Sequence, residues 1–124
     1  MLFRSGLVSP YLGSVQDRII ETFGKDGFAC AAERHLDIRD NHAFAGVNQE
    51  TIADMVRAVA HARPDAITIL CTNLNAAPLV ERLETEIGIP VYDSVATAIW
   101  GALRAAKADP AIVKGWGRLF RMVS

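Results

Sequence analysis

The sequence predicts an α/β fold, built on a four-stranded parallel sheet with helices on both faces. Short apolar runs alternate along the chain with longer amphipathic segments, which is the pattern of βα units. Residues 66–70 are apolar apart from Thr68, as expected of a central parallel strand. With 124 residues, 51% of them hydrophobic and 22% charged, the chain is predicted to form one globular domain, residues 1–124.

The first half predicts two strands, a helix between them and a long loop. Residues 3–8 predict the first strand, and a Ser-Pro-Tyr sequence turns the chain. A helix runs on to about Phe23, capped by Ser14 and with an apolar residue on every fourth position. Residues 28–32 predict the second strand. Residues 36–46 are polar and irregular, and ordered loops of this length in compact domains tend to carry function.

The second half repeats the pattern. Asn48 caps a helix that ends at Pro64 and has an apolar face of Ile52, Met55, Val56 and Val59. The strand at 66–70 leads to a helix at 78–87, which Gly88 ends, and to a fourth strand at 89–92. Asp93 or Ser94 caps the next helix. A last short helix is predicted over 109–124. The predicted architecture is a flavodoxin-like half-fold with right-handed crossovers.

Candidate functional residues follow the strands, because open α/β sheets bind ligands beyond the carboxyl ends of their strands. The first predicted strand ends in Ser9-Pro10-Tyr11, the second leads to Asp40-Asn41, and the third ends in Cys71-Thr72-Asn73. These three segments are expected to meet at one edge of the sheet.

Cys71 is the most specific candidate. A thiol between a strand end and the next helix is expected to meet free backbone N–H groups and the positive end of a helix dipole, which favour a thiolate. Thr72 and Asn73 would supply hydroxyl and amide donors to a bound carboxylate. Such a thiol can exchange a proton with an acidic carbon or add to an alkene carbon. A small buried hydrophobe is the alternative interpretation of Cys71.

The other candidates carry open alternatives. Tyr11 follows a proline and could reach the site or simply pack, and Asn41 could be a turn residue only. His35 and His42 lie in or near the long loop and could touch substrate. Cys30 lies within the second strand and is expected to be a core residue.

Composition and spacing argue against several classes of function and location. The net charge is −1 without a basic stripe, so no nucleic-acid partner is expected. No His/Cys spacing suggests a metal, and no glycine-rich phosphate loop suggests a nucleotide, so no cofactor is expected. No signal peptide or membrane-spanning run is visible, and the two cysteines have no CxxC spacing, so a reducing cytoplasm with free thiols is predicted.

An ordered set of motifs covers nearly the whole chain: Val8-Ser9-Pro10-Tyr11, Asp40-Asn41 with Phe44, the segment 65–74 with Cys71-Thr72-Asn73, Leu83-Glu84, Gly88-Ile89-Pro90-Val91, Ser94 with Ala96 and Trp100, Leu103-Arg104, and Gly115-Trp116-Gly117-Arg118-Leu119. This set resembles the C-terminal half of maleate cis-trans isomerases and of the related arylmalonate decarboxylases, within the aspartate/glutamate racemase superfamily.

The resemblance implies a role for individual residues. Cys71 matches the catalytic cysteine of the second half, Tyr11 and Asn41 match substrate-contacting residues, and Thr72 and Asn73 match the two residues after the cysteine. Ser9 belongs to the same strand-end motif and is predicted to bind substrate with them. Family members are about twice this long, with the active site in a cleft between two halves. Asp93 stands where the family commonly has serine.

The resulting hypothesis is a cofactor-independent isomerase or racemase, maleate isomerase-like, that acts on a small dicarboxylate or α-substituted carboxylate through Cys71. One alternative is an arylmalonate-type decarboxylase. Another is a truncated, non-catalytic domain that oligomerises or binds carboxylates. Because Trp116, Phe120 and Met122 would form an exposed apolar patch on the tail helix, a homodimer or higher oligomer is expected.

Overall fold

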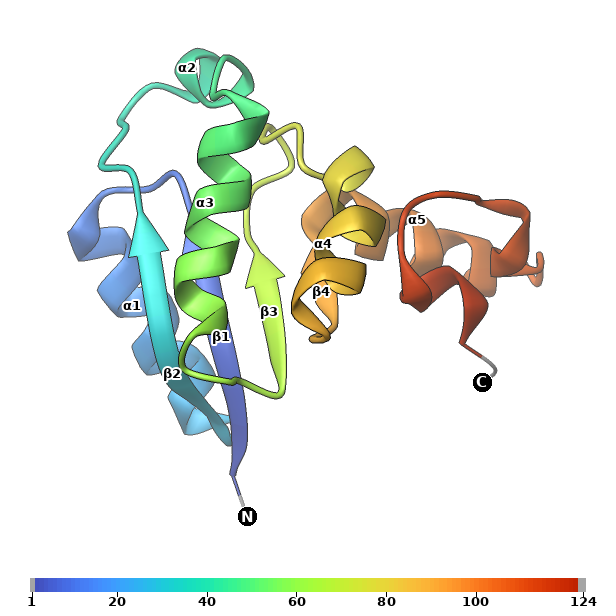
Figure 1. The fold of residues 1–124 in the computed structure, drawn as a ribbon, viewed down its shortest axis with the longest axis horizontal. Coiled ribbons are helices and arrows are strands. Elements are labelled where there is room, and N and C mark those ends of the chain that lie inside the picture. Colours follow the sequence, from blue (N-terminus) through green and yellow to red (C-terminus); the bar gives the residue numbers. More distant parts are fainter. Residues whose placement is uncertain (1, 123–124) are drawn as a thin grey trace.

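The computed structural model describes residues 2–122 and contains one four-stranded parallel sheet with the strand order β2-β1-β3-β4 (Figure 1). The strands are β1 (Phe3–Ser9), β2 (Phe28–His35), β3 (Ala66–Ile69) and β4 (Val91–Asp93). Each neighbouring pair is parallel. This confirms the predicted α/β class and the flavodoxin-like order.

Helices cover both faces of the sheet. Helix α1 (Gly13–Lys25) lies behind it in Figure 1, and α3 (Gln49–Ala60) crosses in front. The remaining helical segments are α2 (Asn41–Ala45), η1 (Ala77–Leu79), α4 (Val80–Ile87), α5 (Ser94–Ala105), η2 (Pro110–Ile112) and η3 (Arg118–Arg121). Each crossover carries the chain back to start the next strand in the same direction.

The main core lies between the sheet and the face covered by α3 and α4. Its fully buried side chains include Val8, Ile52, Val56, Val59, Ile67, Ile69 and Leu83. Helix α3 approaches β1 so closely that a Cβ on Gly6 would stand 2.3 Å from Cγ1 of Val59. Glycine at position 6 therefore sets the spacing between helix and sheet.

The α1 face of the sheet is less covered. Phe3, Phe23 and Phe28 remain 36–43% exposed there, and the three rings pack edge to face. A cavity of about 230 Å³ opens beside them, and its lining is almost entirely apolar. We call this cavity the α1-face groove.

Several predicted boundaries differ from the structure. Helix α1 begins at Gly13 with Leu12 as its N-cap, so Ser14 is not the cap. Strand β2 continues to His35, and β4 starts at Val91 rather than at 89. The predicted loop 36–46 contains α2, which begins because the Asp40 side chain accepts a hydrogen bond from His42 N–H.

The predicted helix over 109–124 is wrong for the residues that are described. The tail forms the two short turns η2 and η3, joined by irregular backbone in which Gly115 and Gly117 have φ of 82° and 106°. Those values are incompatible with a helix. Residues 123 and 124 lie outside the described part of the chain.

The apolar patch expected on the tail is also wrong, except at Met122. Phe120 is 1% exposed and stacks edge to face on Trp116, and both pack against α5. Met122 remains 52% exposed. Exposed phenylalanines lie instead at the α1-face groove.

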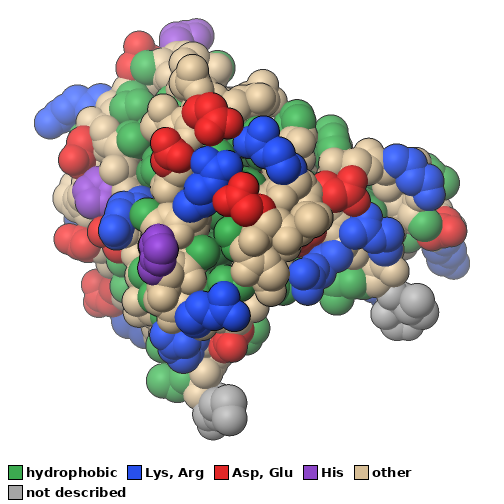
Figure 2. Space-filling model, viewed as in Figure 1, with side chains coloured by type: hydrophobic (Ala, Val, Ile, Leu, Met, Phe, Trp, Pro, Cys, Tyr) green, Lys and Arg blue, Asp and Glu red, His purple; other side chains and the backbone are tan. Residues whose placement is uncertain are grey.

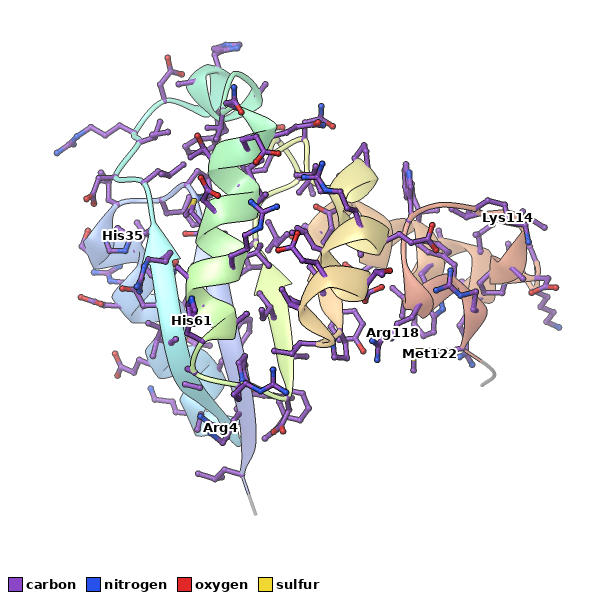
Figure 3. The ribbon with its side chains drawn as sticks, in the orientation of Figure 1. Arg4, His35, His61, Lys114, Arg118 and Met122 are labelled. Carbon is purple, nitrogen blue, oxygen red and sulfur yellow. The ribbon has the colours of Figure 1, made fainter. Side chains whose placement is uncertain are left out.

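The buried carboxylate of Glu84 on α4 connects the C-terminal tail, residues 109–122, to the rest of the domain. Its Oε1 accepts the N–H of Arg118 at 2.8 Å, and its Oε2 accepts the N–H of Val91 at 2.9 Å. A Cβ on Gly117 would stand 2.5 Å from Cγ1 of Val80 and 2.8 Å from the same carboxylate, so only glycine fits. Figure 3 shows Arg118 on the part of the tail nearest α4. Two motifs distant in sequence thus meet around one carboxylate.

On the face that carries α3 and α4, Lys and Arg side chains are interspersed with Asp and Glu (Figure 2). Arg57 is one example, because it pairs with Glu86 on α4 and with Asp54 and Glu50. Within residues 2–122, no helix has the length and apolar character that a bilayer span requires. In the same residues no group of three or more His, Cys, Asp and Glu side chains could hold a metal ion.

Candidate active site

The carboxyl ends of β1 and β3 bring Tyr11 and Cys71 to one edge of the sheet, the upper edge in Figure 1, where α2 also lies. The two strands are adjacent and parallel, with Val8 opposite Ile69. The residues that follow them in sequence therefore become neighbours in space. Sequence reasoning predicted this convergence.

Cys71 is buried, with 8% of its surface exposed, and its backbone is in an unusual conformation. Leu70 N–H makes the last bond to β1, at Val8 O, and Cys71 then adopts φ of 129°. Residues other than glycine seldom take such values, and those that do tend to lie at functional sites. The backbone thus turns sharply where the thiol is presented.

The helix whose N-terminus adjoins Cys71 is α5 rather than the next one in sequence. Helix α4 starts only at Val80, after a loop and η1. Ser94 is the first residue of α5, and its Oγ accepts the N–H of Cys71 at 3.1 Å. Cys71 was expected to lie beside the N-terminus of the helix that follows it in sequence, and it lies instead beside the N-terminus of α5.

Tyr11 packs against the core cluster that contains Cys71. Burial raises the pKa of the Tyr11 phenol, and the nearby Cys71 side chain raises it further. The phenol therefore stays protonated at neutral pH and can donate a hydrogen bond to sulfur or to a ligand. Its ring rests edge to face on Phe44 of α2, with the ring centroids 5.7 Å apart.

Ser9 supports the loop that carries Tyr11. Its hydroxyl donates to Oε1 of Gln16 at 2.6 Å and accepts the N–H of Tyr11 at 3.3 Å. Both Ser9 and Gln16 are buried, with exposures of 0% and 1%. In this arrangement Ser9 acts on the site through the Tyr11 loop, and its predicted contact with substrate remains a prediction.

The segment after β2 holds the Tyr11 loop from the other side. Asp37 N–H donates to Tyr11 O, and Ile38 N–H donates to Pro10 O, both at 3.0 Å. The Asp37 carboxylate also accepts Gly13 N–H at 2.9 Å. Together with Ser9, these contacts fix the backbone on both sides of the tyrosine.

His35 belongs to this support. Its Nδ1 lies 2.8 Å from Oε2 of Glu33, and its Nε2 lies 3.5 Å from the Asp37 carboxylate. The hydrogen bond to Glu33 raises the pKa of His35 most, burial opposes it, and the charges of Glu33, Asp37 and Asp17 add to the rise. His35, which is labelled in Figure 3, thus bridges two carboxylates. Sequence reasoning missed this network, because nothing in local spacing pairs these side chains.

Asn41, Thr72 and Asn73 lie around the site with exposed side chains. Asn41 is the first residue of α2, the helix that packs on Tyr11 through Phe44. Thr72 and Asn73 form the turn after Cys71, which Leu74 N–H closes by donating to Cys71 O. These polar groups are therefore open to a ligand. His42 is exposed beside Asn41.

Cys30 lies apart from these residues, on β2, and is half-buried rather than in the core as expected. Burial raises the pKa of its thiol, and the charge of Glu33 adds to that effect.

Three surface cavities lie beside the helices. The α1-face groove and a second apolar cavity of about 250 Å³ lie along α1, and one of about 610 Å³ lies between α5 and the tail. None of these three is lined by Cys71, Tyr11 or Asn41. The chemistry identifies the site better than cavity size does, because a thiol, a phenol and free polar groups converge at the strand ends.

Comparison with known proteins points in the same direction. A family model described as arylmalonate decarboxylase matches residues 3–120. A maleate isomerase of Nocardia farcinica is 30% identical over 98% of this chain, and an arylmalonate decarboxylase of Bordetella bronchiseptica is 29% identical over 94%. The matches cover 48% and 50% of those proteins, so the chain spans about half the length of the curated relatives it matches.

Solved structures agree with this. The structure of a cysteine-to-serine variant of the Nocardia farcinica maleate cis-trans isomerase, with a covalently bound succinylcysteine intermediate, superposes with a TM-score of 0.90 at 29% identity. The superposition covers 98% of this chain and 49% of the isomerase chain. A structure of arylmalonate decarboxylase gives a TM-score of 0.83 at 26% identity, over 97% of this chain and 54% of the other.

Proposed function

The chain belongs to the arylmalonate decarboxylase family, and on that premise we propose that it forms the half of a cofactor-independent enzyme that carries the reactive thiol, Cys71. The substrate is a small dicarboxylate or α-substituted carboxylate, and the preferred reaction is maleate isomerase-like. The observation that supports this most is that the buried Cys71 thiol and the partly buried Tyr11 phenol converge where two adjacent strands end.

In the proposed reaction the Cys71 thiolate adds to one alkene carbon of a cis diacid. An S–C bond forms, and the π electrons move onto the other carbon and its carboxylate as an enediolate. The central bond is then single and rotates. Expulsion of the thiolate restores the double bond in the trans form, so no atoms are gained or lost. A succinylcysteine intermediate in the isomerase relative is an adduct of this kind, and it is carried there by a cysteine other than the one replaced by serine in that variant.

The neighbours of the thiol have defined tasks in this proposal. Tyr11 donates its phenolic proton toward the enediolate oxygens or the sulfur. Asn41, Thr72 and Asn73 hold carboxylate oxygens from the rim of the site. Donors aimed at developing negative charge are the largest single contribution in many enzymes. Each of the rim side chains is exposed and therefore free to do so.

A decarboxylase is the second candidate, favoured by the family model and by the decarboxylase relative. Carbon dioxide would leave an α-substituted malonate, the bonding electrons would remain as an enediolate, and Cys71 would deliver its proton to that carbon. The thiolate would regain a proton from solvent. A racemase-type exchange of an α-proton uses the same thiol and needs no other group on this chain.

The test is turnover by the purified chain. Maleate, aspartate, glutamate and an arylmalonate are each incubated with the protein in D₂O and followed by proton NMR, beside Cys71→Ala and Cys30→Ala. Conversion or α-proton exchange that is lost only in Cys71→Ala supports the proposal, and the substrate identifies the reaction. Unchanged turnover in Cys71→Ala refutes it.

A chain that binds a dicarboxylate with equal affinity in wild type and in Cys71→Ala, and turns nothing over, is instead a non-catalytic carboxylate-binding domain. Titration calorimetry with maleate separates these cases.

We also propose that the chain associates into a homodimer or higher oligomer in the cytoplasm, where its two cysteines stay reduced. The α1-face groove supplies apolar surface for association. Sedimentation at micromolar concentration tests this, and a monomer there refutes it.

A further inference from the structure

The hydroxyl of Ser94, the first residue of α5, makes hydrogen bonds to the last residue of β3 and to Cys71 itself. Ser94 Oγ donates to Ile69 O at 3.0 Å and accepts Cys71 N–H at 3.1 Å. The direction of both bonds is fixed, because a carbonyl can only accept and a peptide N–H can only donate. The single hydroxyl proton is therefore committed to Ile69, and the oxygen lone pair is committed to Cys71.

The sheet register explains why Ser94 lies there. Strand β4 pairs with β3 so that Asp93 lies opposite Ile69. This is the last pair of the two strands, so the residues that follow β3 and those that follow β4 leave the sheet side by side. Asp93 is fully buried and caps α5, because its Oδ2 accepts Ala96 N–H at 2.9 Å. The cap fixes the first turn of α5 and, with it, the place of the Ser94 side chain.

The residue that Ser94 holds is the one with unusual backbone geometry. Cys71 has φ of 129° and lies outside every strand and helix. A non-glycine residue in such a conformation is strained and persists only where its surroundings impose it. The Ser94 bond is the contact of the described chain that engages the Cys71 peptide N–H directly.

We infer that Ser94 is the positioning residue of the thiol: its hydroxyl holds Cys71 in the left-handed conformation that directs the sulfur into the site beside Tyr11. Ser94 acts through Cys71 and does not touch the substrate. The inference rests on the proposed function only for its effect on turnover, because the geometry of the thiol can be measured without a substrate.

The first experiment measures alkylation of Cys71 by iodoacetamide, with mass spectrometry to separate it from Cys30. Ser94→Ala removes the hydroxyl, so the turn relaxes and the buried thiol becomes more accessible. We expect alkylation of Cys71 to accelerate by about fivefold or more, with that of Cys30 unchanged. Ser94→Thr keeps the hydroxyl and should return the rate to within about twofold of wild type.

Thr97→Val is the matched control. Thr97 lies one turn further along α5, and its hydroxyl donates to Ser94 O without reaching Cys71. This variant should leave the alkylation of Cys71 as in wild type. Equal acceleration in Ser94→Ala and Thr97→Val, or a Cys71 rate in Ser94→Ala within about twofold of wild type, overturns the inference.

A second measurement needs no variant and covers the case in which Ser94→Ala does not fold. In the wild-type chain the amide of Cys71 should be protected from hydrogen exchange, although it lies outside regular secondary structure, whereas the exposed turn residues Thr72 and Asn73 should exchange fast. A Cys71 amide that exchanges as fast as theirs overturns the inference.

Turnover separates this inference from the proposed function. With an active wild type, Ser94→Ala should lower kcat by about tenfold or more while KM stays near its original value. If the wild type is inactive but the thiol and its amide respond as described, the positioning role stands and the proposed function fails. If Cys71→Ala abolishes turnover while Ser94→Ala leaves alkylation and kcat unchanged, the function stands and the positioning role fails.

Discussion

Replacing Glu84 with glutamine should destabilise the protein far more than the same change at Glu81, three residues earlier on α4. The Glu84 side chain is 5% exposed and accepts two backbone N–H groups, from Val91 and Arg118. Glutamine keeps one oxygen and turns an NH₂ group toward the second N–H. One bond to a charged acceptor is lost, worth about 1.5–3 kcal/mol, and a buried donor is left unpaired.

The expected loss for Glu84→Gln is therefore about 2–5 kcal/mol of unfolding free energy. Glu81 is 41% exposed and pairs with Arg121, itself 60% exposed, on the same tail. An exposed ion pair of this kind contributes about 0–1 kcal/mol, so Glu81→Gln should remain close to wild type. Both variants remove one carboxylate from α4, which makes the comparison specific for burial.

Urea unfolding provides the assay, with two probes. Far-UV circular dichroism follows the whole chain, whereas tryptophan fluorescence follows the tail, because both tryptophans, Trp100 and Trp116, pack in the cluster of α5 and the tail. In Glu84→Gln we expect the fluorescence transition to move to lower urea first. Coincident midpoints for the two variants would refute the view that this carboxylate fastens the tail.

Three further outcomes follow from the geometry. Gly6→Ala should lower the free energy of unfolding by about 1–3 kcal/mol, because the added methyl group would clash with Val59. Adding Val59→Ala to the same chain should restore part of this loss, and thermal unfolding of the single and double variants tests both expectations. Glu33 raises the pKa of His35, so the folded state binds the imidazole proton more tightly than the unfolded state does. The resulting stabilisation is complete below the unfolded pKa of about 6.5, and it is lost as the pH rises through the higher folded pKa. His35→Asn should therefore reduce unfolding free energy at pH of about 5.5 but hardly at pH of about 9, and an equal reduction at both contradicts the bridge. Tyr11→Phe removes the hydroxyl beside the thiol and should lower kcat/KM by about 10²-fold in the NMR assay while the thermal midpoint stays within a few degrees; retained activity excludes the phenol from the chemistry.

The sequence was sufficient for the sheet and for most of its helices. Alternating apolar runs identify buried strands, and their order along the chain with parallel crossovers leaves few arrangements. The same logic predicts that Tyr11 and Cys71 lie at one edge of the sheet, because residues that follow parallel strands must meet there.

What the sequence could not reveal were contacts between segments far apart in the chain. Helix α2 is too short to show a period, so only the Asp40 cap could have indicated it. The helix predicted over 109–124 does not form in the described tail, because Gly115 and Gly117 adopt positive φ. Ser94 and Cys71 lie on different βα units, and their bond depends on the register of β3 with β4.

The edges of the sheet discourage strand addition, for different reasons at each side. Strand β4 spans only Val91–Asp93, too short to template another chain, while β2 presents the charged pair Glu33-Arg34 and its pairing with β1 shifts register between Ser5 and Gly6. Short, bulged and charged edges are how natural sheets resist edge-to-edge aggregation. The association proposed above would therefore use a face of the sheet, where apolar side chains meet. If oligomers form in concentrated samples, we expect no thioflavin-positive fibres.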